Sequence, residues 1–251
     1  MDKLKIGKYE FNSRFILGSG KFSLDLISSA INEAKVEIIT LALRRAMSRS
    51  ENILDFIPKN VTLLPNTSGA RNANEALRIA KLSRELGCGD MIKLEIISDS
   101  KYLLPDNYES VKAVELLVKE NFTPLVYMYP DLYAARALEQ AGAAAIMPLG
   151  APIGSNKGLL TKEFIQILLN EFSLPIIVDA GIGTPSQACE AMQMGVSAIM
   201  ANTAIAEAND IAKMAKAFSL AIEAGRSAYL AGVASISDAK ASSPLTGFLR
   251  D

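Results

Sequence analysis

The sequence predicts a (β/α)8 barrel, in which eight parallel strands form a closed ring surrounded by helices. The chain has 251 residues, close to the ~250 residues that are typical of this fold as one domain. Short apolar runs alternate with helical patterns along the chain, and this alternation indicates parallel strand pairing. Eight such runs are present. A doubly wound open sheet is the alternative, but it would have fewer strands and an early GxGxxG motif.

The predicted strands are short and rich in apolar residues. In chain order they are Phe15–Leu17, Val36–Leu41, Val61–Leu64, Met91–Ile97, Pro124–Tyr129, Ala144–Pro148, Pro175–Asp179 and Ala198–Ala201. After the first of them, Gly18-Ser19-Gly20-Lys21 is only a partial glycine-rich turn, without the spacing of a P-loop. The dinucleotide-binding signature of an open sheet is therefore missing.

Amphipathic helices are predicted between these strands. Apolar residues recur at helical spacing most clearly in Asn72–Leu86, Tyr108–Lys119 and Thr161–Asn170. The segment after Ala231 is instead rich in Ala, Ser and Gly. We therefore expect one barrel domain over residues 1–251, with a partly ordered C-terminal tail near 235–251.

Composition excludes several classes of function. The net charge is −1 and the chain has no long run of Lys or Arg, so nucleic-acid binding has no electrostatic support. Cys88 and Cys189 lie far apart and suggest no disulfide framework, which favours a cytoplasmic location. The longest uncharged stretch, residues 140–156, is interrupted by Gly and Pro, so no membrane span is expected.

The chain contains no histidine. This absence excludes Ser-His-Asp and Cys-His mechanisms and the usual His-ligated metal sites. Acid–base chemistry must therefore be carried by Lys, Asp, Glu, Tyr or Cys.

The most informative segment is the fourth predicted strand. Side chains alternate across a strand, so Lys93 and Glu95 share one face while Leu94 lies on the other. Positions facing the inside of a barrel are rarely solvated, and burial lowers the pKa of a lysine. A neutral amine formed in this way could attack a carbonyl to give an imine. The alternative is an ion pair with a structural role.

A second acid, Asp179, ends the seventh predicted strand just before a Gly-x-Gly turn. The carboxyl ends of barrel strands form the active-site face, so this carboxylate is expected at the barrel mouth. An N-cap role is the alternative. Thr184 followed by Pro185 is the better N-cap, because proline is favoured at the first helical position. Asp179 is therefore available for chemistry.

A phosphate site is predicted on the loops after strands seven and eight, where barrels commonly bind phosphate. Glycines let backbone N–H groups approach an anion closely. The candidate residues are Ala180, Gly181, Gly183, Asn202 and Thr203. The long glycine-dense loop 148–158 follows strand six and reads as functional. Arg44 and Arg45 could hold an anionic group or form a solvated charge pair.

These motifs together resemble the bacterial and plastid thiazole synthases of thiamine biosynthesis over nearly the whole chain. The opening motifs Ile6–Arg14 and Gly18–Lys21 are similar to that family, as are the later motifs in the same order. These are Leu41–Arg45, Leu63–Thr67, Met91–Glu95, Met147–Ser155, Val178–Pro185 and Asn202–Ala206. Several long motifs in one order are more specific than any one of them.

The resemblance implies an enzyme, a sulfur-transferring transferase that builds the thiazole phosphate. Its substrates would be 1-deoxy-D-xylulose 5-phosphate, dehydroglycine and sulfur from a small thiocarboxylated carrier protein. Lys93 would form the imine with the sugar ketone, and Glu95 and Asp179 would be the acid–base carboxylates. The substrate-binding residues would be Gly154, Ala180, Gly181, Asn202 and Thr203. Imine formation needs no cofactor, and no metal is implied.

The resemblance also implies partners: a dehydroglycine-producing enzyme and further copies of the chain, as a homo-oligomer (a tetramer). The sequence departs from the family at Met91, where tryptophan is usual, at Val126, where proline is more common, and at Asn156-Lys157, where a smaller residue is common. These departures remove no catalytic group and leave the pocket wall and the loop dynamics as open questions. The alternatives are a class I sugar-phosphate aldolase and a sugar-phosphate-binding barrel without catalysis.

Overall fold

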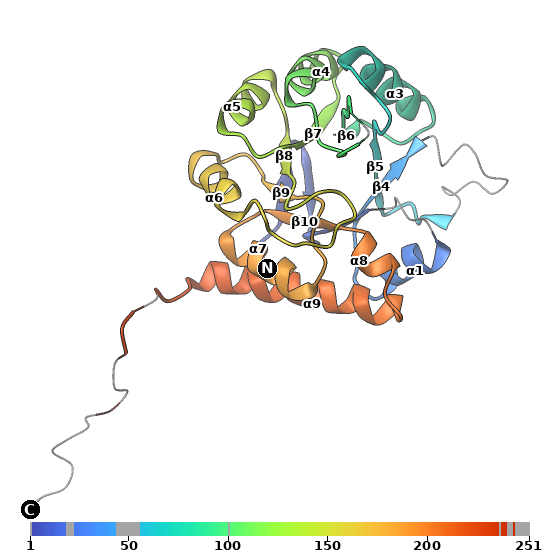
Figure 1. The fold of residues 1–251 in the computed structure, drawn as a ribbon. Helices are drawn as coiled ribbons and strands as arrows, with labels where there is room; N and C mark the ends of the chain where they lie inside the picture. The colour runs from blue at the N-terminus through green and yellow to red at the C-terminus, as the bar shows by residue number, and fades with distance from the viewer. Residues whose placement is uncertain are drawn as a thin grey trace, which may run out of the picture.

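The computed structural model describes residues 2–18, 23–43, 56–99, 101–235, 237–239 and 243. Within them, parallel strands form one barrel (Figure 1). In pairing order the strands are β8 (Ala145–Pro148), β7 (Thr123–Met128), β6 (Met91–Leu94), β5 (Thr62–Asn66), β4 (Ile38–Ala42), β3 (Phe15–Leu17), β10 (Ala198–Ala201) and β9 (Ile177–Val178). Each coincides with a predicted strand, with shifts only at the ends.

The ring closes between β8 and the segment around β9. Parallel bridges join Ile146 to Ile176 and Leu149 to Asp179, and the Asp179 N–H donates to the Pro148 carbonyl at 3.1 Å. Eight parallel strands that close on themselves confirm the predicted (β/α)8 class, and the open-sheet alternative is wrong.

Helices form the outer ring in Figure 1. They are α1 (Leu24–Asn32), α3 (Ala73–Glu85), α4 (Asn107–Lys119), α5 (Leu132–Ala141), α6 (Lys162–Glu171), α7 (Pro185–Met194), the short α8 (Thr203–Ala206) and α9 (Ile211–Ala231). Several begin at a side-chain cap. The carboxamide of Asn72 caps α3, and the carboxylate of Asp106 caps α4. Such caps satisfy the orphan N–H groups of the first turn.

Strand alternation divides the core into two parts. Ile92 and Leu94 of β6 face the helices and belong to the large outer core, whereas Met91 belongs to the cluster inside the barrel. The inner cluster also includes Leu64, Leu125 and Ile177. Lys93 shares the inward face with Met91 but lies nearer the carboxyl end of β6. The barrel interior is therefore apolar toward the amino ends of the strands and charged toward their carboxyl ends.

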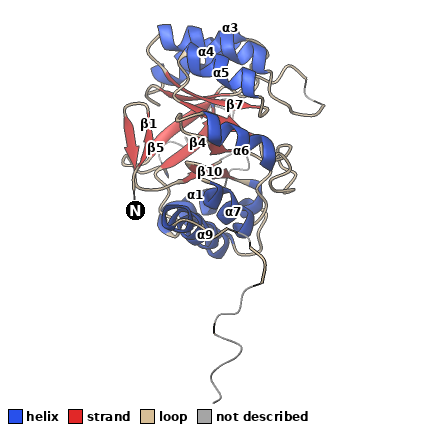
Figure 2. Ribbon diagram, turned by 90° about the vertical axis from the view of Figure 1, so that its left-hand side faces the viewer, coloured by secondary structure: helices blue, strands red, loops and turns tan. Residues whose placement is uncertain are grey.

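An N-terminal hairpin was not predicted from the sequence. Antiparallel strands β1 (Leu4–Ile6) and β2 (Tyr9–Phe11) lie at one end of the barrel, on the left in Figure 2. Leu4, Ile6 and Phe11 join the inner apolar cluster. Each of these strands has only three residues, with a charged residue at its centre. Such a short segment shows no periodic hydrophobic pattern in the sequence.

Some predictions fall outside the described residues: the Ser19-Gly20-Lys21 part of the first turn, Arg44 and Arg45, and most of the tail. The tail residues 232–235 follow α9, have no regular structure and are exposed. In the described part of the chain, no helix combines the length and apolar character needed to cross a bilayer.

The hairpin leads to a stability prediction. Ile6 is fully buried, so Ile6→Ala should lower the free energy of unfolding by about 2–5 kcal/mol through lost burial and the cavity left behind. Lys5→Ala, on the exposed face of the same strand, should change it by less than ~1 kcal/mol. Urea unfolding of both variants measures this, and equal effects would show that the hairpin is not part of the core.

Candidate functional site

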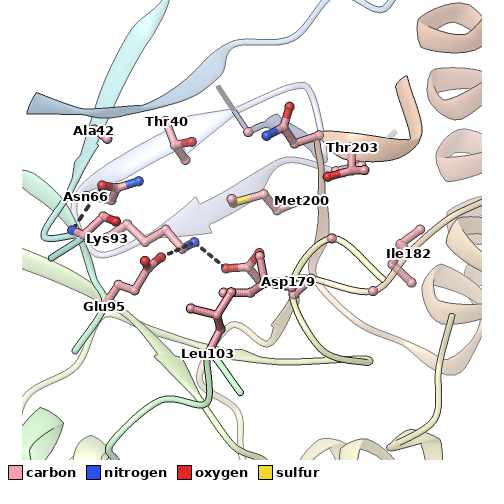
Figure 3. Close-up of a pocket in the computed structure, with 18 of the residues that line it drawn as sticks. Thr40, Ala42, Asn66, Lys93, Glu95, Leu103, Asp179, Ile182, Met200 and Thr203 are labelled. Carbon is pink, nitrogen blue, oxygen red and sulfur yellow. Dashed lines mark hydrogen bonds and ion pairs between the residues drawn. The ribbon is translucent and has the colours of Figure 1, made fainter. Parts of the chain in front are cut away.

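A buried lysine and two carboxylates form the centre of the site (Figure 3). The Lys93 ammonium nitrogen lies 2.7 Å from Asp179 Oδ2 and 3.2 Å from Glu95 Oε2. The three residues are 4%, 4% and 8% exposed. The structure therefore brings together the three side chains that were predicted to act as one group.

The barrel fixes each member of this cluster. Lys93 points inward from β6, and Asp179 lies across the interior after β9, where its backbone bridges to β8. Glu95 follows the end of β6, and its backbone is anchored twice. The Glu95 N–H donates to Thr67 Oγ1 at 2.9 Å, and the Thr67 hydroxyl donates to the Glu95 carbonyl at 2.8 Å.

The charge state of Lys93 differs from the sequence-based expectation. Burial does favour the neutral amine, but the charges of Asp179 and Glu95 outweigh it and raise the pKa of Lys93. The expected lowering was wrong because a sequence gives no distance between the lysine and the second carboxylate. Lys93 is therefore an ammonium in the resting protein.

The pKa of Asp179 is raised, which makes its carboxylate a better proton acceptor. Burial raises the pKa of Asp179 more than the neighbouring Lys93 lowers it, and the charge of Glu95 adds to the rise. One ammonium does not neutralise two buried carboxylates, so Asp179 binds a proton more readily than an exposed carboxylate does. Asp179 can thus accept a proton from the lysine that it contacts.

The cluster lies against a cavity of about 600 Å³. Most of the residues proposed from sequence line it: Lys93, Glu95, Asp179, Gly154, Ala180, Gly181, Asn202 and Thr203. The phosphate-site candidate Gly183 is not among the lining residues, and its N–H donates to Gln187 Oε1 at 2.9 Å instead. In Figure 3, Lys93 and Glu95 lie on one side of this cavity and Thr203, from the segment after β10, lies on the other.

The loop after β9 has an unusual backbone. Ala180 and Gly181 both have left-handed φ angles, of 62° and 86°. A Cβ on Gly181 would lie 2.4 Å from the backbone nitrogen of Ala151, so only glycine fits there. Thr184 caps α7 in a capping box with Gln187, with proline at the start of the helix. This confirms the predicted cap and leaves Asp179 free of that role.

The family departures fall in different places. Met91 lies in the inner apolar cluster and is not among the residues lining the cavity, so this departure lies outside the cavity wall. It sits one layer below Lys93. Val126 faces the helices. Asn156 does line the cavity and adopts a left-handed φ of 52°.

Several residues of the cavity wall were missed. Thr40, Asn66, Ser68 and Met200 line the cavity, and Figure 3 shows Thr40 and Asn66 on the wall opposite Glu95. Inward register at the carboxyl ends of the strands is the sequence signal that could have selected Thr40, Asn66 and Met200. In the described part of the chain, no three His, Cys, Asp or Glu side chains are grouped so that they could hold a metal ion.

Tyr127 lies behind the charged cluster. Its side chain is fully buried, its ring centre is 5.2 Å from the Lys93 nitrogen, and its hydroxyl has no protein hydrogen-bond partner. Burial, together with the charges of Asp179 and Glu95, raises the pKa of Tyr127. The ring therefore packs against the ammonium as a neutral phenol.

Comparison with known proteins gives one consistent result. Residues 5–244 match the family model described as thiazole biosynthesis protein ThiG. A Campylobacter jejuni protein named thiazole synthase is 80% identical, with 100% of this chain and 97% of the relative covered. A Fusobacterium nucleatum protein of the same name is 69% identical, covering 99% and 98%. The crystal structure of the Amycolatopsis orientalis BexX/CysO complex contains a chain with 33% identity and a TM-score of 0.85, covering 94% and 98%.

The unpaired phenol leads to a stability prediction. A buried polar group without a partner destabilises a protein by about 1–3 kcal/mol, so Tyr127→Phe should raise the free energy of unfolding, by ~1 kcal/mol. Tyr129→Phe, at a partly exposed position, should change it by less than ~0.5 kcal/mol. Denaturant unfolding measures both, and a loss of stability in Tyr127→Phe would contradict the assignment.

Proposed function

This chain belongs to the thiazole synthase family of thiamine biosynthesis, and we propose that it forms the thiazole phosphate through an imine on Lys93. The proposed substrates are 1-deoxy-D-xylulose 5-phosphate, dehydroglycine and sulfur carried as a protein thiocarboxylate. The observation that carries the proposal is the buried lysine held between two carboxylates at one end of a cavity.

The first step is the release of a neutral amine. Of the two carboxylates, Asp179 lies nearer the Lys93 nitrogen, with Oδ2 at 2.7 Å, and burial makes this carboxylate easier to protonate. A ligand that enters the cavity displaces water, and this desolvation disfavours the charged forms of both groups relative to their neutral forms. Transfer of one proton from Lys93 to Asp179 leaves both groups neutral and the amine nucleophilic.

The amine then attacks the ketone carbon of the sugar and forms a carbinolamine. The carbon–oxygen bond breaks with proton donation from one of the two carboxylic groups, and the former ketone oxygen leaves as water. The carbon–nitrogen double bond of the imine remains. We assign to Glu95, whose Oε2 lies 3.2 Å from the same nitrogen, the removal of protons from the adjacent sugar carbon in later steps.

The other end of the cavity is the proposed phosphate site. The residues proposed to bind the phosphate, Gly154, Ala180, Gly181, Asn202 and Thr203, all line the cavity. The left-handed pair at Ala180 and Gly181 turns the backbone sharply, as in the loops that present N–H groups to anions. In barrels, the loops after strands seven and eight commonly bind phosphate. A phosphate held there would direct the ketone toward Lys93.

The sulfur donor must reach a lysine that is almost fully buried. Only a narrow, extended chain end can do so, which supports a carrier protein that presents a C-terminal thiocarboxylate. The BexX/CysO structure, which contains a chain similar to this one, is a complex of two proteins. A dehydroglycine-producing enzyme and a homo-oligomer remain predictions, as does a cytoplasmic location.

A class I aldolase is the second candidate, because it would also use a buried lysine and a phosphate site. It would cleave a sugar phosphate without a sulfur donor. The high identity to proteins named thiazole synthase favours the first candidate. Product formation that depends on the thiocarboxylated carrier separates the two.

Borohydride trapping tests the imine. Reduction in the presence of the sugar phosphate should fix an adduct on Lys93, and Lys93→Met should abolish it because no amine remains. Lys112→Met removes an exposed lysine of α4 and should trap normally. Asp179→Asn should slow trapping by about 10²–10⁴-fold, since the proton acceptor is lost. Peptide mass mapping locates the adduct, and an adduct on another lysine would contradict the proposal.

A further inference from the structure

The wall opposite the carboxylates carries a polar side chain that the proposed chemistry does not yet use. Asn66 is the last residue of β5 and pairs in register with Lys93 on β6. Both residues line the cavity, and Figure 3 shows the Asn66 side chain beside Lys93, on the side away from Glu95. Asn66 is therefore next to the amine that forms the proposed imine.

Local hydrogen bonding fixes the orientation of the Asn66 amide. The backbone N–H of Ser68 donates to Asn66 Oδ1 at 3.2 Å. A backbone N–H can only donate, so the oxygen of the amide must face Ser68 and the NH₂ group must point the other way. In Figure 3 the amide nitrogen points into the cavity. Within the described residues, this NH₂ has no hydrogen-bond partner of its own.

Lys93 thus has hydrogen-bond acceptors on one side and a hydrogen-bond donor on the other. Glu95 and Asp179 accept hydrogen bonds, whereas the Asn66 NH₂ can only donate. A ketone oxygen, or a hydroxyl on the carbon next to the ketone, is an acceptor. A donor fixed beside the reactive amine can hold such an oxygen while the carbonyl carbon turns toward Lys93.

We propose that Asn66 is a substrate-binding residue that donates a hydrogen bond to the hydroxyl on the carbon next to the reacting ketone. This inference rests on the proposed function, since it takes a phosphorylated ketose as the ligand. It makes Asn66 a determinant of specificity. Ketoses that carry this hydroxyl would be selected over ketones that lack it, because a missing hydroxyl leaves the partly buried amide of Asn66 unpaired.

The test is equilibrium binding, measured by calorimetry, of two ligands: 1-deoxy-D-xylulose 5-phosphate and its analogue without the hydroxyl next to the ketone. Asn66→Ala should weaken binding of the sugar by about three- to tenfold, as expected for one hydrogen bond. It should leave binding of the analogue unchanged. Asn66→Asp keeps the shape and the acceptor for Ser68 but removes the donor, and it should weaken sugar binding at least as much.

Asn32→Ala, at an exposed position of α1, is the control and should bind both ligands normally. Equal losses for sugar and analogue, or no loss for either, would overturn the inference. Selective loss in Asn66→Ala without any borohydride adduct on Lys93 would support the Asn66 contact and count against the imine. Failure of the wild-type protein to bind either ligand would overturn both.

Discussion

The contact between the Lys93 ammonium and two buried carboxylates is the interaction on which the site depends. Charges inside a protein are tolerated only when they are paired and hydrogen-bonded. Asp179 and Glu95 supply that pairing at 2.7 and 3.2 Å. One positive charge between two negative ones leaves an excess negative charge, which favours uptake of a proton. The resting site is thus prepared for proton transfer.

The barrel stabilises this buried charge cluster by separating an apolar layer of its interior from the layer that contains the cavity. Below Lys93, the apolar cluster and the N-terminal hairpin fill the interior with side chains such as Met91 and Ile6. Above it, the cavity lies within the loops at the carboxyl ends of the strands. A packed lower layer keeps water from one side of the ion cluster, which strengthens every charge interaction in it. Strand β6 therefore contributes to both layers, with Met91 in the apolar cluster and Lys93 at the cavity.

Sequence patterns predicted the strands of the barrel because hydrophobic alternation and strand spacing are local properties. They also selected Lys93, Glu95 and Asp179, since inward register and strand ends follow from position along the chain. They did not predict the direction of the Lys93 pKa shift, which depends on a distance across the barrel. Asn66 was missed for a similar reason, because its importance comes from its neighbour on the adjacent strand. The hairpin was too short to produce a periodic signal.

The proposed chemistry depends most directly on the protonation state of Lys93 in the resting protein. Titration of ¹³C-labelled lysine by NMR, with Lys93→Met to assign the signal, measures its pKa. We expect a pKa above the ordinary lysine value of 10.5, because the charges of the two carboxylates outweigh burial. A Lys93 signal that titrates near neutral pH would contradict it and show that burial alone prepares the amine.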